Sequence, residues 1–161
     1  MRKLVLLALL MPVCVLADPM PPVDPTTPIY TVKVEPGVTY EDVVTSLKVA
    51  AEGKNFVSPA TFPIGQHIKE RGLPLQGIIE VRSYCSLGIG AEILMESPEF
   101  AVFAPCRIAI YEKQGQLYLS LDRPTYALNH IKNHSRKAAA AAQEMEDTLL
   151  WIMDKARRGD I

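Results

Sequence analysis

Apolar and polar positions alternate along four stretches of this chain, in the pattern of β-strands. Residues 29–35 and 77–84 are rich in β-branched and aromatic side chains, and their alternation predicts two strands. The runs 105–112 and 116–121 have the same character and are separated by a short loop that ends in Gly115. A glycine in so short a connection predicts a β-hairpin.

Three other segments have the spacing of helices. Thr39 precedes an apolar run that continues to Gly53, with acidic residues in its first turn, which predicts an N-capped helix. A shorter helix is predicted over 64–71. Ser86 is positioned to begin a further helix near 87–95.

The C-terminal segment predicts one long helix. Pro124 suits the first turn of a helix, and nothing after it breaks a helical pattern until Gly159. The apolar residues of this segment form one stripe at helical spacing: Met145, Leu149, Ile152 and Ala156, widened by Leu150, Trp151 and Met153. Such a stripe is too apolar to remain in water, so we expect it to be buried against its own domain, a second tail, or another protein or membrane surface.

The order of these elements is typical of an α+β domain. A length of 161 residues fits one globular domain, and 48% hydrophobic with 22% charged residues exclude a disordered chain. The formal net charge of -1 gives no general electrostatic reason to bind nucleic acid.

Residues 1–17 have the features of a secretory signal peptide, because Arg2 and Lys3 are followed by an apolar run that ends at Ala17. No apolar run reaches the length of about 20 residues that a membrane span needs. The sequence therefore predicts cleavage after Ala17 and a periplasmic chain without a transmembrane span. Residues 18–28 contain five prolines and predict a stiff, solvated lead-in.

Cleavage would leave two cysteines, Cys85 and Cys106, at the end of one predicted strand and the start of another. In an exported protein such a pair first predicts a disulfide; two buried free thiols, or a metal-binding or redox pair, are the alternatives. His130 and His134 lie four residues apart on the predicted C-terminal helix and share a face. Two histidines without a nearby carboxylate or thiolate are too few for a metal site.

Cationic and aromatic side chains on the predicted strands suggest a ligand-binding face. Arg82, Tyr84 and Arg107, if they share one concave face, would receive a ligand with an acidic group. The alternative is ordinary sheet packing with arginines at the solvent edge. No phosphate-binding loop, catalytic triad order or carboxylate pair stands out, so we predict no catalytic residue and no particular cofactor.

Several stretches resemble a known family. They are residues 79–85 (IEVRSYC), 95–99 (MESPE) and 104–113 (APCRIAIYEK) followed by Gly115. Together with the opening strand and helix, they resemble the family called domain of unknown function 302 over residues 29–130. The resemblance implies a curved antiparallel sheet packed against helices, similar to the TATA-binding-protein-like fold and often dimeric, with no established catalytic activity. The lead-in and a helical tail, residues 131–161, lie outside the resemblance.

These observations favour a non-enzymatic, exported binding or accessory domain in the periplasm. Because the family-like part is complete near residue 130, we expect the apolar stripe of the tail to dock a second copy, as in a homodimer, or another periplasmic protein. The residues expected to make that contact are Met145, Leu149, Trp151 and Ile152. The alternative is a redox or metal-handling protein that uses Cys85 and Cys106.

Overall fold

The computed structural model describes residues 18–161, so the predicted signal peptide, residues 1–17, lies outside the described residues. The strands are β1 (Ile29–Lys33), β2 (Thr61–Phe62), β3 (Ile79–Tyr84), β4 (Cys106–Lys113) and β5 (Gln116–Asp122). The helices are α1 (Tyr40–Gly53), α2 (Ile64–Glu70), α3 (Leu87–Glu96), the 3-10 helix η1 (Pro98–Phe103), α4 (Pro124–Asn129) and α5 (Arg136–Arg157). The α+β fold class is confirmed.

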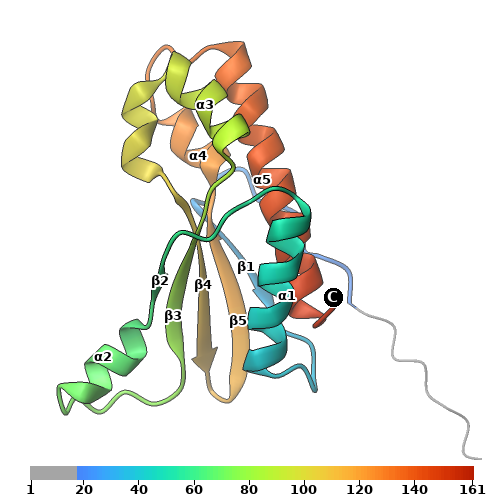
Figure 1. Cartoon of the computed structure of the whole chain (residues 1–161), viewed down its shortest axis with the longest axis vertical. Coiled ribbons are helices and arrows are strands. Elements are labelled where there is room, and N and C mark those ends of the chain that lie inside the picture. The colour runs from blue at the N-terminus through green and yellow to red at the C-terminus, as the bar shows by residue number, and fades with distance from the viewer. Residues whose placement is uncertain (1–17) are drawn as a thin grey trace, which may run out of the picture.

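The five strands form one antiparallel sheet in the order β1-β5-β4-β3-β2 (Figure 1). The predicted hairpin joins β4 to β5, and its Gln114 and Gly115 both have positive φ angles, of 54° and 76°. β2 was not predicted, because a strand of two residues is too short for alternation to show.

Local signals at the start of α1 act as predicted. The Thr39 hydroxyl accepts a hydrogen bond from the backbone N–H of Asp42 at 3.1 Å, and the Asp42 carboxylate accepts one from the backbone N–H of Thr39 at 2.9 Å. This capping box satisfies two donors that the first helical turn would otherwise leave free.

Within residues 18–161, helices cover one face of the sheet, and no helix covers the other. On the covered face, Ile108 and Ile110 of β4 and Leu119 and Leu121 of β5 are fully buried in the same core as α1 and α5. Burying each such side chain is worth about 1.5–3 kcal/mol, so this interface holds the helices to the sheet. α3, η1 and α4 gather beyond one end of the strands, and α2 lies near the other end (Figure 1).

The C-terminal segment is two helices, not the single helix predicted from Pro124 onward. α4 ends at Asn129, and Asn133 in the connection has a φ of 61°, in the left-handed region that interrupts a helix. Ser135 then caps α5 by accepting a hydrogen bond from the backbone N–H of Ala138 at 3.1 Å. The pattern missed this break because neither proline nor glycine marks it.

α5 is part of the core. It packs along α1 and α3 and also contacts α4 and β5. Met145, Leu149 and Ile152 are buried within the same chain. The expectation that these three dock another molecule is therefore wrong: the covered face of the sheet needs this helix to exclude water from its own apolar side chains.

Residues 18–28 have mostly exposed side chains, as predicted, but their backbone is attached to the domain. Three side chains donate four hydrogen bonds to carbonyl oxygens of this lead-in: Tyr30 to Pro21 at 2.6 Å, Arg123 to Asp24 at 2.6 Å and to Thr27 at 2.8 Å, and Arg157 to Asp18. The lead-in lies beside the edge strand β1 and is not a free spacer. Within residues 18–161, no helix has the length and apolar character needed to cross a membrane.

Candidate binding surface

The three side chains predicted to share a ligand face lie on opposite faces of the sheet. Glu80, Arg82 and Tyr84 all project from the helix-covered face of β3. In the register with β4, Arg82 lies opposite Ile108 and Tyr84 lies opposite Cys106. Arg107 lies between Cys106 and Ile108 on β4. Because successive side chains of a strand alternate between faces, Arg107 projects from the other face of the sheet. The predicted ligand face of Arg82, Tyr84 and Arg107 is therefore wrong, because the register separates its members.

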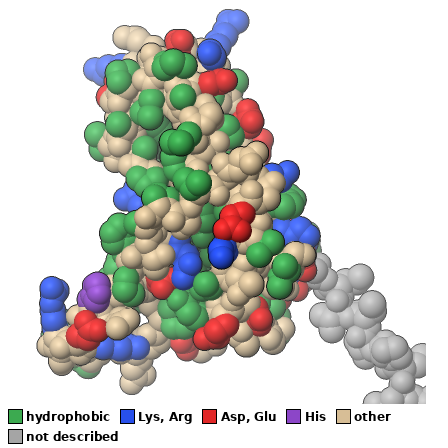
Figure 2. Space-filling model, viewed as in Figure 1, with side chains coloured by type: hydrophobic (Ala, Val, Ile, Leu, Met, Phe, Trp, Pro, Cys, Tyr) green, Lys and Arg blue, Asp and Glu red, His purple; other side chains and the backbone are tan. Residues whose placement is uncertain are grey.

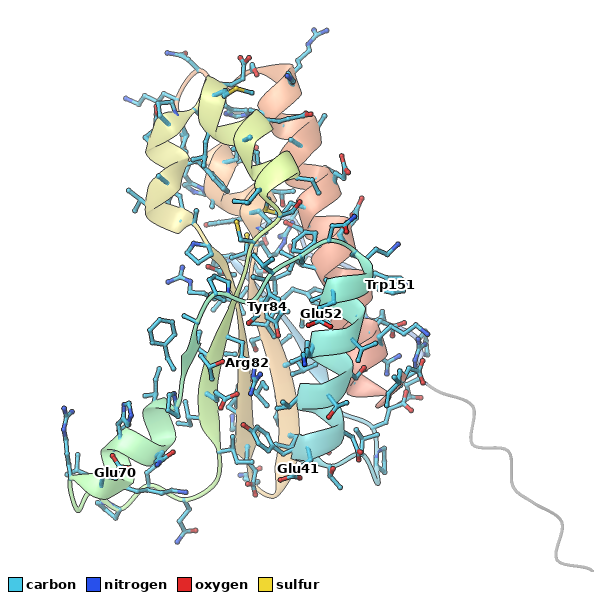
Figure 3. All side chains as sticks on the ribbon, in the orientation of Figure 1. Glu41, Glu52, Glu70, Arg82, Tyr84 and Trp151 are labelled. Atoms are coloured by element: carbon cyan, nitrogen blue, oxygen red, sulfur yellow. The ribbon has the colours of Figure 1, made fainter. Side chains whose placement is uncertain are left out.

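Arg82 and Tyr84 have structural contacts on the covered face (Figure 3). The Arg82 Nε donates to the Glu80 carboxylate at 2.6 Å, and the Tyr40 hydroxyl donates to the same carboxylate at 2.8 Å. These contacts tie β3 to the start of α1. Burial raises the pKa of Tyr84 well above its ordinary range, so its hydroxyl stays protonated.

The opposite face, which we call the open face, has a polar strip over its centre. Tyr111 and Tyr118 stack with ring centroids 5.4 Å apart, and the Ser120 hydroxyl donates to the Tyr111 hydroxyl at 3.3 Å. Ser120 also exchanges a hydrogen bond with Thr31 across the β1–β5 pair at 2.7 Å. These contacts satisfy polar groups on a face that no helix covers in the described part of the chain.

Arg107 and Asp122 form an ion pair at one end of the open face. The Arg107 Nε and Nη2 donate to one carboxylate oxygen of Asp122 at 2.8 and 2.6 Å, and the backbone N–H of Arg107 donates to the other oxygen at 2.7 Å. Burial raises the pKa of Asp122, while the hydrogen bonds from Arg107 oppose that rise. The pair thereby cancels the charge at this end of the face.

An apolar groove lies on one side of this ion pair. It encloses about 650 Å³ and runs from β2 across β3 to η1. Its lining residues are Pro59, Ala60, Phe62, Ile64, Val81, Ser83, Val102, Ala104, Pro105 and Arg107. Phe62 is 51% exposed and Val102 81% exposed, which is unusual for such large apolar side chains. Sequence reasoning missed this groove because it depends on β2 and η1, which carry no clear periodic signal.

A second hollow, which we call the η1–α4 pocket, lies on the other side of Arg107. It encloses about 290 Å³. It is lined by Pro28, Ile29, Phe100, Phe103, Cys106, Arg107, Asp122, Arg123, Pro124, Tyr126, Ala127 and His130. Hydrophobic side chains are also exposed nearby on the helical end of the molecule, where Figure 2 shows them gathered over α3 and η1.

The two cysteines are free thiols, so the predicted disulfide is wrong in this structure. Cys106 lies directly across from Tyr84 in the β3–β4 register, and Cys85 follows Tyr84 beyond the end of β3, where it lines a hollow with Lys54 and with Glu144 of α5. The Cys106 Sγ lies 3.3 Å from the Met145 Sδ. Burial raises the pKa of Cys106 to about 12, which keeps its thiol protonated at neutral pH.

The histidine pair is not arranged as predicted either. His130 ends α4 and His134 lies in the connection to α5, so the two do not share a helix face. Each has its Nδ1 within hydrogen-bond distance of a nearby carbonyl oxygen, at 2.8 Å from Tyr126 and 2.9 Å from Ile131. Among residues 18–161, no group of three or more His, Cys, Asp or Glu side chains is arranged to hold a metal ion.

Of the four residues predicted to dock a partner, only Trp151 is exposed, at 41% (Figure 3). The Lys54 ammonium lies 4.6 Å from the centroid of its ring, and the Lys155 ammonium lies at 6.0 Å. A cation–π contact of this exposed kind is worth about 0.5–1 kcal/mol, so Trp151 links α1 to α5 on the surface.

Comparisons with known proteins agree with this fold. The profile of the family described as "Domain of unknown function DUF302" matches residues 30–156, a range that includes most of α5. An uncharacterized protein of Aquifex aeolicus (strain VF5) is 39% identical over 114 residues, which cover 71% of this chain and 67% of that protein. The crystal structure of an uncharacterized conserved DUF302 protein from Bacillus stearothermophilus has a TM-score of 0.72 at 20% identity, over 80% of this chain and 98% of that one.

Proposed function

This chain belongs to the DUF302 family, a family of domains of unknown function, so we propose its role from the features of its own surface. We propose that it is an exported periplasmic binding or accessory domain that associates with a second copy through the open face of its sheet. The observation that carries this proposal is the apolar groove on the face without a helix. Large exposed apolar patches mark interaction sites in soluble proteins.

The shape of the groove favours a second copy as the occupant. Phe62 and Val102 protrude beside the hollow that they help to line, so a protruding group and a recess lie next to each other. In a two-fold dimer the same patch meets itself, and such a patch must carry both a projection and a recess. Charge does not oppose this contact, because Arg107 is already paired with Asp122.

Export to the periplasm is the second part of the proposal. It is supported by the basic start, the apolar run and the small residue Ala17 at the expected cleavage position. In cells that produce the full chain, we expect the protein in the periplasmic fraction, with Asp18 as its first residue by N-terminal sequencing. A chain recovered from the cytoplasm with residues 1–17 still attached would contradict this part.

Light scattering of the chain 18–161 tests self-association. We expect a dimer for the wild type, and monomers with unchanged circular dichroism for Phe62→Glu and for Val102→Glu, because a charge in the groove would be buried without a partner. Trp151→Glu is the matched control on the helical side and should remain a dimer. A wild-type monomer, or a dimer that only Trp151→Glu disrupts, would overturn the open-face proposal.

Redox or metal handling by Cys85 and Cys106 has no comparable support. The two cysteines are free thiols, and the buried thiol of Cys106 packs against Met145. A thiol with its pKa raised to about 12 is a poor nucleophile and a poor metal ligand at neutral pH, because the reactive form is the thiolate.

A further inference from the structure

The η1–α4 pocket has walls made largely of rings. Phe100 and Phe103 of η1 lie with their ring centroids 6.0 Å apart, and Tyr126 of α4 forms part of the same lining. Pro28 and Pro124 add two further rings. Flat, rigid walls of this kind favour planar ligands, which stack face to face or edge to face with aromatic side chains.

The ionic groups that line this pocket are compensated within the chain. Arg107 is paired with Asp122 through three hydrogen bonds, and Arg123 is paired with the buried Glu146 at 2.9 Å. The Cys106 thiol is neutral at physiological pH, as described above. A charged ligand would find no unpaired opposite charge among these groups, and an anion would lie beside the Asp122 carboxylate.

His130 supplies a polar group at the edge of the lining. Its ring lies 4.4 Å from the ring of Tyr126, and its Nδ1 is engaged by the Tyr126 carbonyl oxygen at 2.8 Å. Within residues 18–161, no hydrogen bond involves the other ring nitrogen, Nε2. Because the Tyr126 carbonyl can only accept, Nδ1 carries the hydrogen of the neutral ring, and Nε2 is free to accept a hydrogen bond from a ligand.

From the ring-lined walls, the internally compensated ions and the free Nε2 of His130, we propose that the η1–α4 pocket binds a small, uncharged aromatic molecule that carries a hydroxyl group. The ring of the ligand packs against Phe103 and Tyr126, and its hydroxyl donates a hydrogen bond to the Nε2 of His130. A volume of about 290 Å³ is at the lower end of the range for small-molecule sites, which limits the ligand to a compact one.

Titration of the chain 18–161 by two-dimensional NMR with three probes tests the ligand class. The probes are 4-methylphenol, its saturated counterpart 4-methylcyclohexanol, and the anion benzoate. We expect saturable shifts at residues of η1 and α4 with 4-methylphenol, and at least tenfold weaker binding of the other two. Tighter binding of benzoate would overturn the uncharged class, equal binding of 4-methylcyclohexanol would overturn the aromatic class, and no saturable shift at these residues would overturn the site.

Two pairs of variants locate the binding. Ala127→Phe fills the pocket from α4 and should weaken 4-methylphenol binding at least tenfold, whereas Ala140→Phe on the exposed side of α5 should not change it. His130→Ala should weaken binding severalfold, and His134→Ala, outside the pocket, should leave it unchanged. If Ala127→Phe disturbs folding, the histidine pair decides, and equal affinities for those two variants overturn the role of His130.

This inference does not depend on self-association. Phe62 does not line the η1–α4 pocket, so the Phe62→Glu variant retains the pocket whether or not it is a monomer. Binding of 4-methylphenol by Phe62→Glu with wild-type affinity would separate the two proposals, and loss of binding in that variant would contradict the assignment to this pocket.

Discussion

Cys106 shows how one side chain acquires its properties from its neighbours. It begins β4, is buried against the Met145 thioether, and keeps its proton because a thiolate in that apolar site would lose its hydration. Burial also raises the pKa of Asp122, across the hairpin, and the hydrogen bonds from Arg107 oppose that rise. Adjacent positions on β4 therefore carry an inert thiol and a paired guanidinium, because alternation directs one inward and the other outward.

Alkaline pH should destabilise the fold through Cys106. Its pKa rises from an ordinary value of 9.0 to about 12 on folding, so the folded state retains a proton that the unfolded state releases. The stabilisation is complete below about pH 9 and is lost as the pH rises toward 12, at a cost on the order of 4 kcal/mol. Urea unfolding from pH 8 to 11 should show this decline, to which the buried Tyr84 also contributes.

The Cys106→Ala variant isolates this effect. It should be less stable than the wild type at pH 8 but should lose less free energy of unfolding between pH 9 and 11. Cys85→Ala removes the partly exposed thiol, leaves Cys106 in place, and should keep the wild-type decline. If Cys106→Ala and the wild type lost equal free energy of unfolding between pH 9 and 11, another group would be responsible for the decline.

At the scale of elements, α5 determines whether the sheet has a core. It supplies apolar side chains along most of its length to the covered face, and it contacts α1, α3, α4 and β5. The family match likewise extends to residue 156 and so includes most of this helix. Because the amphipathic stripe of α5 is buried over most of the helix, it stabilises the fold of its own domain and is not exposed for contact with another molecule.

Shortening one side chain of α5 should be costly. Leu149 is fully buried, and Leu149→Ala is expected to lower the free energy of unfolding by about 2–5 kcal/mol, because it removes buried methyl groups and leaves a cavity. Gln143→Ala, on the exposed side of the same helix, should change it by less than about 0.5 kcal/mol. Urea unfolding monitored by circular dichroism measures both.

Removal of residues 136–161 should abolish folding, because the covered face of the sheet would then be exposed to water. A truncated chain that unfolds cooperatively and keeps the native circular dichroism spectrum would show instead that α5 is dispensable for the fold.

At the scale of the whole molecule, two arginines connect segments that are far apart in the chain. Arg123 bonds to Glu146 of α5 and to carbonyl oxygens of the lead-in, and Arg157 at the end of α5 bonds to Glu35 after β1 and to the Asp18 carbonyl. The N-terminal lead-in, the edge strand and the C-terminal helix are thereby joined. This arrangement holds the lead-in beside the edge strand β1.

Breaking the Arg123–Glu146 pair should destabilise the whole domain. The two side chains are 6% and 2% exposed, and Glu146 also accepts a hydrogen bond from the backbone N–H of Thr125 at 3.1 Å. Glu146→Ala should cost about 3–5 kcal/mol, because the guanidinium would remain buried without a partner. Hydrogen exchange should also become faster in the backbone of residues 18–28, which Arg123 helps to hold.

The exposed pair Lys155–Asp160 is the matched control for that prediction. Its atoms lie 3.3 Å apart at the surface, so Lys155→Ala should change the free energy of unfolding by about 0–1 kcal/mol. Equal losses in Glu146→Ala and Lys155→Ala would show that burial does not distinguish the two pairs.

The sequence by itself determined most of the local structure of this protein. Alternation identified four of the five strands, Thr39 identified the start of α1, and Gly115 identified the hairpin, because these signals act between residues a few positions apart. For the candidate site, the sequence identified Arg107 as a candidate ligand-binding residue but grouped it with Arg82 and Tyr84, which the register places on the other face.

Only the tertiary structure decided which faces are covered and which are left open. The apolar stripe of α5 predicts burial equally well against its own domain or against a partner, and only the docking of α5 beside α1 shows that the stripe lies inside. The groove and the η1–α4 pocket likewise arise where β2, η1 and α4 meet the ends of β3, β4 and β5. The hydrophobic effect favours burial of an apolar surface but does not specify the surface against which it is buried, because it is non-directional. That second surface is determined by contacts between residues distant in the chain.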